Sequence, residues 1–200
     1  MLPDGVRETD AIRRTKHTRL YAIQPRWYQS LHDAMVRPGV MDGWRTRGRP
    51  LLVAEFENVI VRPQALGVVA TTHSGVAIGM VELINFDALD RRAEVSVLEF
   101  EAHQGSGLII EATLAALDEG FARFDLRKVY AHASPGASAD TFMRAGELGI
   151  IQVEGTLTAF TLIDGRYADI TIGSVTRDAL TTALRNPLIG SLANEWRLTA

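Results

Sequence analysis

The 200-residue chain contains no cysteine. This absence excludes disulfide bonds, a thiolate nucleophile, cysteine-ligated zinc and iron–sulfur clusters. The five histidines are scattered along the sequence rather than spaced as a metal-binding motif. We therefore expect a protein that uses no metal cofactor.

Neither sign of charge dominates the chain, which has 21 Lys and Arg residues against 24 Asp and Glu residues and a net charge of -3. The broad basic field that holds nucleic acid or anionic lipid is therefore absent. No apolar run approaches the roughly 20 residues of a membrane span, and residues 1–20 are polar and charged rather than typical of a signal peptide. These patterns predict a cytoplasmic protein with no nucleic-acid or membrane partner.

Hydrophobic residues make up 46% of the sequence, which is enough for one sizeable core. Residues 1–16 have no apolar periodicity and are expected to form a flexible N-terminal arm. Periodic segments follow over residues 17–180, which we expect to form one domain. Residues 181–200 are interrupted by Pro187 and Gly190, and we expect a C-terminal tail there.

The hydrophobic patterns predict an α+β fold with a mixed sheet. In the helix expected at residues 107–124, apolar residues share one stripe and Glu111 and Glu119 lie away from it. An Asp164-Gly165 turn separates the last two expected strands. We expect strands at residues 17–24, 65–72, 76–86, 93–100, 129–133, 150–162 and 168–175, and helices at residues 25–36, 51–61, 107–124 and 138–148.

Two strings resemble motif A of the Gcn5-related N-acetyltransferase (GNAT) superfamily, whose loop is written Q/R-x-x-G-x-G/A. They are residues 93–97 (AEVSV) and residues 104–109 (QGSGLI), followed by the long helix. A third string, residues 164–169 (DGRYAD), is similar to the closing hairpin of the ribosomal-protein-alanine acetyltransferase branch. The resemblance covers residues 17–180.

The resemblance implies a mixed, mostly antiparallel sheet of six to seven strands with helices on both faces. It also implies an acyl-CoA-dependent acyltransferase, which passes an acetyl or longer acyl group from coenzyme A to an amine by direct attack in a ternary complex. The physical reason for the loop is anion binding. Gly105 and Gly107 let backbone N–H groups point at a pyrophosphate where a helix N-terminus adds partial positive charge.

Carried over residue by residue, the resemblance makes Glu94 the candidate general base. An ion pair between Glu94 and the neighbouring Arg91 or Arg92 is the alternative. The pantetheine arm is expected to pair with the strand near its end, and the pyrophosphate with the loop. The candidate cofactor-binding residues are Leu98, Glu99, Phe100, Gln104, Gly105, Ser106, Gly107, Leu108, Ile109, Ser138 and Phe142.

The chain departs from the family pattern at five positions. Gln104 and Ser106 stand where relatives commonly place Arg and Lys, and the other three departures are Ile109, Pro135 and Phe142. Ile109 replaces the last Gly or Ala of the loop, so a side chain is expected where the backbone approaches the phosphates. Pro135 replaces an Asn. Phe142 replaces the Tyr that protonates the departing thiolate, and it has no hydroxyl to donate. Phe142 can be interpreted as a core aromatic. Alternatively, Tyr130 or Tyr167 supplies the proton in its place.

These departures leave other functions open. Gln104 and Ser106 carry no charge, so an acyl carrier protein could replace free coenzyme A as the donor. A GNAT-fold protein without catalysis, acting as a binding module, is a further alternative. The acceptor could be a small-molecule amine or a protein N-terminus, and a homodimer is possible.

Overall fold

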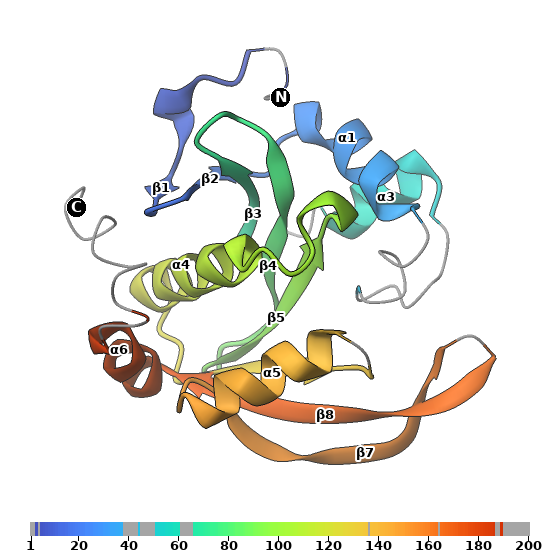
Figure 1. The fold of residues 1–200 in the computed structure, drawn as a ribbon, viewed down its shortest axis with the longest axis vertical. Helices are drawn as coiled ribbons and strands as arrows, with labels where there is room; N and C mark the ends of the chain where they lie inside the picture. The colour runs from blue at the N-terminus through green and yellow to red at the C-terminus, as the bar shows by residue number, and fades with distance from the viewer. Residues whose placement is uncertain are drawn as a thin grey trace.

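The computed structural model describes residues 3, 5–37, 44, 51–60, 66–135, 137–163, 165–186 and 189. Its strands are β1 (Arg13–Arg14), β2 (Thr18–Ala22), β3 (Leu66–Thr72), β4 (Ala77–Asp87), β5 (Arg92–Glu99), β6 (Lys128–Ala133), β7 (Gln152–Ile163) and β8 (Arg166–Thr176). Its helices are α1 (Pro25–Met35), α3 (Val53–Ile60), α4 (Leu108–Arg123), α5 (Ala137–Glu147) and α6 (Arg177–Arg185), with short 3-10 turns η1 (Glu8–Asp10) and η2 (Glu101–His103) (Figure 1).

The strands form an eight-stranded sheet in the order β1-β2-β3-β4-β5-β6-β8-β7. Every described pairing is antiparallel except that of β5 with β6. The predicted α+β class and mixed sheet are therefore confirmed, with β1 in addition to the strands expected from the sequence. β1 lies within the segment expected to be an arm, and it pairs with β2.

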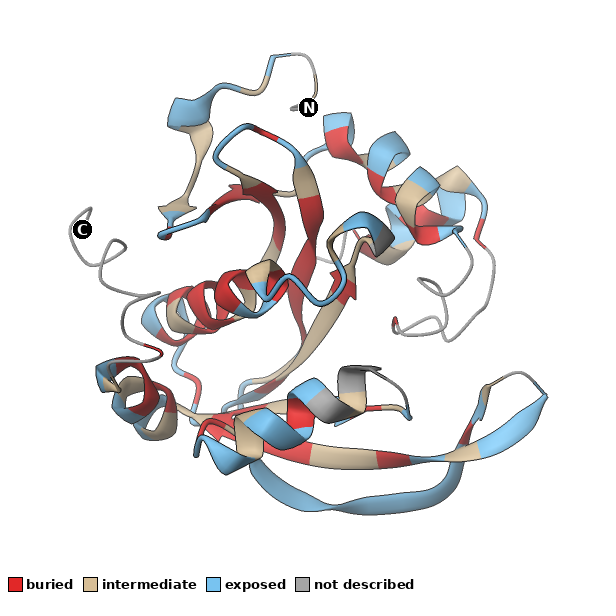
Figure 2. Ribbon diagram, in the orientation of Figure 1, coloured by how far each residue is buried: buried red, intermediate tan, exposed pale blue. Residues whose placement is uncertain are grey.

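Helices cover both faces of the sheet, as predicted. One hydrophobic cluster joins α4 to the strands through residues such as Leu114, Leu117 and Phe121. The other joins α1 and α3 to the opposite face and includes Trp27 and Phe56. In Figure 2 most of the α4 ribbon is coloured as buried.

The expected burial of α4 is wrong at two glutamates. Glu111 is only 1% exposed and Glu119 is 7% exposed. Glu111 accepts hydrogen bonds from the backbone N–H and the ring Nδ1 of His17, at 2.8 and 2.9 Å. Arg13 Nε donates to Glu119 at 2.6 Å. β1 and its turn therefore cover a flank of α4 that the helix pattern alone assigns to solvent.

The hairpin of β7 and β8 is long, and its outer strand β7 is exposed over most of its length (Figure 2). Asp164 of the expected turn lies outside the described residues, but Gly165 has a φ of 74°, which suits a tight turn. Among the described residues, no helix is long and apolar enough to cross a membrane.

Candidate active site

The pairing between β5 and β6 ends halfway along β5. Their parallel pairing joins residues 92–95 to residues 128–131 and ends at Val95 and Ala131. Beyond that point β5 continues to Glu99 beside β4, while β6 continues to Ala133 beside β8. Past Val95 and Ala131 the two strands are no longer paired, and we call this unpaired region between β5 and β6 the fork.

The backbone of β5 presents alternate residues to this fork. Phe100 donates its N–H to Ile78 O of the β4 side at 3.0 Å. Successive residues of a strand direct their backbone N–H groups to opposite edges of that strand. Leu98 therefore also directs its N–H toward β4, whereas Val97 and Glu99 direct theirs toward the fork. The N–H groups of Leu98 and Phe100, which lie in the stretch expected to pair with the pantetheine arm, are therefore directed at β4 and not into the fork. Val97 was missed, although the two-residue alternation alone could have indicated it.

The loop before α4 presents backbone amides to solvent. Gly105 and Gly107 both have a φ of 77°, and a side chain added to either would meet nothing within 4 Å. The N–H groups of Gly105, Gly107 and Ile109 donate no hydrogen bond to any described residue. Backbone amides without a partner at the N-terminus of a helix of this length provide a partly positive site suited to an anion.

Ile109 does not obstruct this loop, which corrects the expectation drawn from the sequence. Its side chain is 7% exposed and belongs to the core under α4. Its Cδ1 lies 2.7 Å from where a Cβ on Gly79 would be. The backbone of the loop is therefore accessible despite the departure from the family pattern.

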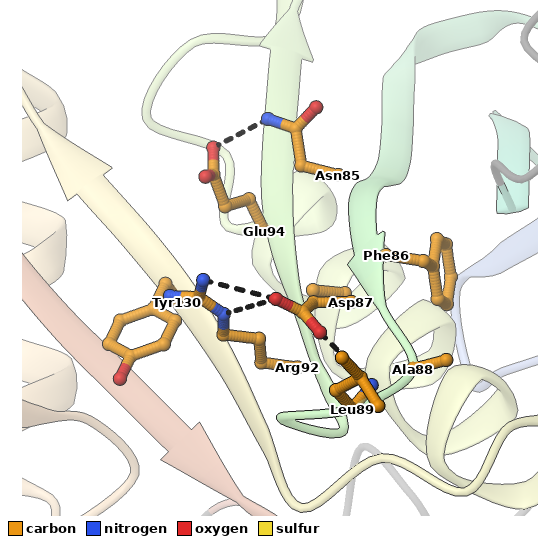
Figure 3. Close-up of a pocket in the computed structure, with 9 residues that line it drawn as sticks. Asn85, Phe86, Asp87, Ala88, Leu89, Arg92, Glu94 and Tyr130 are labelled. Carbon is orange, nitrogen blue, oxygen red and sulfur yellow. Dashed lines mark hydrogen bonds and ion pairs between the residues drawn. The ribbon is translucent and has the colours of Figure 1, made fainter.

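Glu94 lies on β5 directly before the fork and lines a cavity of about 590 Å³ (Figure 3). Its Oε2 accepts a hydrogen bond from Asn85 Nδ2 at 3.1 Å. The alternative ion pair with arginine is wrong: Arg92 contacts Asp87 and Asp90, and Arg91 contacts Asp125. Glu94 as a residue is half-buried, and its carboxylate has a neutral partner in a hydrogen bond that is open to solvent.

The other charged groups of this cavity are already engaged. Asp87 accepts hydrogen bonds from Arg92 and from the backbone N–H groups of Leu89 and Asp90. The Asp90 N–H, followed by Arg92, lowers the pKa of Asp87 below its ordinary range. Asp87 is therefore ionised at neutral pH.

Tyr130 of β6 is the register partner of Glu94 and lines the same cavity. Lys128 Nζ lies 5.5 Å from the centroid of its ring and also donates to Glu154 at 2.8 Å. The other tyrosine weighed as a proton donor, Tyr167, is 75% exposed on the β7–β8 hairpin.

Phe142 on α5 is 6% exposed and packs over β8. A Cβ added at Gly173 would lie 2.5 Å from its Cζ. Its interpretation as a core aromatic is confirmed. The side chain of Ser138 lies outside the described residues.

Glu99 and Leu98 point to opposite faces of β5. Leu98 is buried with α1 and α3, whereas Glu99 stands on the α4 side by alternation. Glu99 is half-buried, and this burial raises the pKa of its carboxyl above the ordinary range. Gln104, Gly105, Ser106 and Gly107 are exposed, and Leu108 is half-buried.

Comparison with known proteins identifies the family. Residues 20–146 match the family described as "Acetyltransferase (GNAT) domain". The chain belongs to this GNAT family. The fork and the glycine loop of this GNAT domain lie within or beside the matched strands and helix.

Several named relatives are spermidine N(1)-acetyltransferases. The protein of Vibrio cholerae serotype O1 is 33% identical over 93 residues, or 46% of this chain and 53% of that protein. The Escherichia coli K12 protein is 30% identical over 95 residues, or 46% and 49% of the two chains. The matches thus span about half the length of these relatives.

The solved structure of Vibrio cholerae spermidine N-acetyltransferase in complex with CoA and spermine has the same fold. Its TM-score is 0.72 at 23% identity, with 82% of this chain and 98% of that chain covered. The structure of a chimera of the Vibrio cholerae enzyme with hSSAT has a TM-score of 0.70 at 23% identity, with 84% of this chain and 99% of that chain covered. These relatives do not support the expected ribosomal-protein-alanine branch.

Proposed function

We propose that the chain is an acetyl-CoA-dependent N-acetyltransferase whose acceptor is a primary amine of a small polyamine such as spermidine. The observation that carries the proposal is the end of the β5–β6 pairing at Val95 and Ala131, directly after Glu94. This arrangement puts an opening in the sheet beside a carboxylate. The named spermidine acetyltransferases support the choice of acceptor.

Two features support the donor. The free amides of Gly105, Gly107 and Ile109 can receive the pyrophosphate of coenzyme A. The backbone of Val97 and Glu99, directed into the fork, can pair with the pantetheine arm and polarise the thioester carbonyl. The donor thus needs no cationic side chain in the loop.

The chemistry follows from these positions. A polyamine nitrogen is protonated at neutral pH, so Glu94 takes its proton before or during attack. The neutral nitrogen then forms a bond to the thioester carbon, the C–S bond breaks, and the sulfur leaves with the electron pair as the thiolate of coenzyme A. The nitrogen gives its second proton to that thiolate or to water, which leaves the neutral amide. A thiol has an ordinary pKa near 8.5, so this departure needs little assistance.

The cavity at Glu94 also suits a cationic acceptor. Its carboxylates are Asp87 and Glu94, and Arg92, its basic side chain among the described residues, is occupied by Asp87 and Asp90. The Glu94 charge therefore remains available to an ammonium group. Leu89, which also lines the cavity, offers apolar surface for the methylene chain.

The test is to incubate the protein with acetyl-CoA and spermidine, spermine or a peptide with an N-terminal alanine, and to follow thiol release and the acetylated product by mass spectrometry. We expect N-acetylated polyamine and equimolar free coenzyme A. Acetylation of the peptide alone would contradict the acceptor. Turnover with acetyl-phosphopantetheine equal to that with acetyl-CoA would favour a carrier-protein donor, and no thermal shift with acetyl-CoA would favour the binding module.

A further inference from the structure

A β-bulge interrupts β4 opposite Glu94. The β4–β5 register shifts between Ile84 and Asp87, so β4 carries an extra residue at this point. Asn85 within the bulge has a φ of 54°, in the left-handed region that Asn tolerates better than most residues. Bulges of this kind re-aim side chains next to functional sites.

The bulge brings Asn85 onto the face of the sheet that carries Glu94. Without the extra residue, alternation would place Asn85 on the same side as Leu83, which packs under α4. Instead Phe86 takes the α4 side, where its ring lies 4.7 Å from that of Phe124. Figure 3 shows the Asn85 amide directed at the Glu94 carboxylate.

The hydrogen bond leaves half of the carboxylate free. Asn85 Nδ2 donates to Glu94 Oε2 at 3.1 Å, and Glu94 Oε1 has no partner among the described residues. A neutral amide fixes the orientation of a carboxylate, whereas a bound arginine would favour its ionised form strongly and weaken it as a base. The arginines nearby are held by other acids.

We propose that Asn85 is a positioning residue that holds Glu94 so that Oε1 faces the amine of the acceptor. The proposal rests on the role of Glu94 proposed above. The function of the bulge is then to place the amide of Asn85 on the face of the sheet that carries Glu94, where it can donate a hydrogen bond to the Glu94 carboxylate.

The test compares N85G, N85D and E94Q. Glycine keeps the left-handed backbone and removes only the amide, so N85G should lower kcat/KM by about 10-fold while the Kd for acetyl-CoA and the Tm change little. N85D sets a second carboxylate beside Glu94, so the acid limb of its pH–rate profile should move to higher pH. The charged and titratable groups that also face this cavity, Asp87, Arg92 and Tyr130, are the same in all variants.

The double variant N85G/E94Q separates positioning from structure. If Asn85 acts through Glu94, N85G should cost nothing further once Glu94 is replaced. An equal loss from N85G in both backgrounds, or wild-type kcat/KM and pH profile in N85G, would overturn the role of Asn85 while leaving that of Glu94 intact. Undiminished activity in E94Q would overturn both.

Discussion

The side chain of Ile109 fills the space that a side chain on Gly79 would need. Ile109 Cδ1 and Leu98 O lie 2.7 and 2.3 Å from the position of a Cβ at residue 79. The large residue at the start of α4 is thus matched by the smallest residue on β4. This match lets Ile109 point into the core, so the amides of the loop remain open to an anion.

Replacing Gly79 by alanine should therefore disturb both the core and the loop. Because the Leu98 carbonyl is backbone and cannot move aside cheaply, we expect G79A to lower the free energy of unfolding by about 2–3 kcal/mol. G155A is the matched control, since a Cβ at residue 155 meets nothing within 4 Å. Urea unfolding measures the difference, and equal midpoints for the two variants would contradict the packing described.

Alanine at Gly107 should weaken donor binding. Its φ of 77° costs a side chain about 1 kcal/mol, and relief of that strain would turn the amides away from their shared direction. We expect an increase on the order of 10-fold in the Kd for acetyl-CoA, measured by calorimetry. G149A carries the same kind of strain at a φ of 71°, outside the loop; if it weakened the donor equally, the loop would not be the binding element.

Local patterns predicted the elements, since α1, α3, α4 and the β3–β5 meander follow from the period of their apolar residues and from Pro25, Gly107 and the turns between strands. Patterns also located the Glu94 strand and the glycine loop. They could not show the burial of Glu111 or Glu119, because that depends on pairing with His17 and Arg13, far away in the chain. The Asn85 contact depends on a bulge, which no period reveals.

Glu119 should make stability depend on pH in the acid range. Burial works to raise the pKa of Glu119, but Arg123 and Arg13 outweigh it, so the pKa is lowered in the folded chain. A lowered folded pKa contributes stability above the unfolded value of about 4.3, and this contribution is lost as pH falls through the folded value.

E119Q should therefore be less stable than the wild type at pH 7 by about 2 kcal/mol, and the difference should shrink as the pH falls below about 4. D118N is the control, because Asp118 is a partner of Arg13 at 3.3 Å but is 42% exposed, and it should cost under about 1 kcal/mol. A difference between E119Q and wild type that stays constant with pH would show that the ion pairs do not set the pKa.

Ala159 offers a stabilising substitution. It lies in the irregular part of β7 with a φ of 49°, and its N–H donates to Asp169 Oδ1 at 2.8 Å. Glycine adopts this backbone without strain, so A159G should raise the free energy of unfolding by about 0.5–1 kcal/mol despite the entropy that glycine loses. A168G, in the regular register of β8, should lower it by a similar amount, and the same sign for both variants would refute the strain at Ala159.

The central claim is that Glu94 removes the proton of the acceptor amine while the loop and the fork hold the donor. The most direct measurement is the turnover of E94Q with acetyl-CoA and spermidine, together with its Kd for acetyl-CoA. We predict a loss of about 10²-fold or more in kcat with the donor Kd unchanged within about twofold. Turnover within a few-fold of the wild type, or a loss explained by weaker donor binding, would contradict the account.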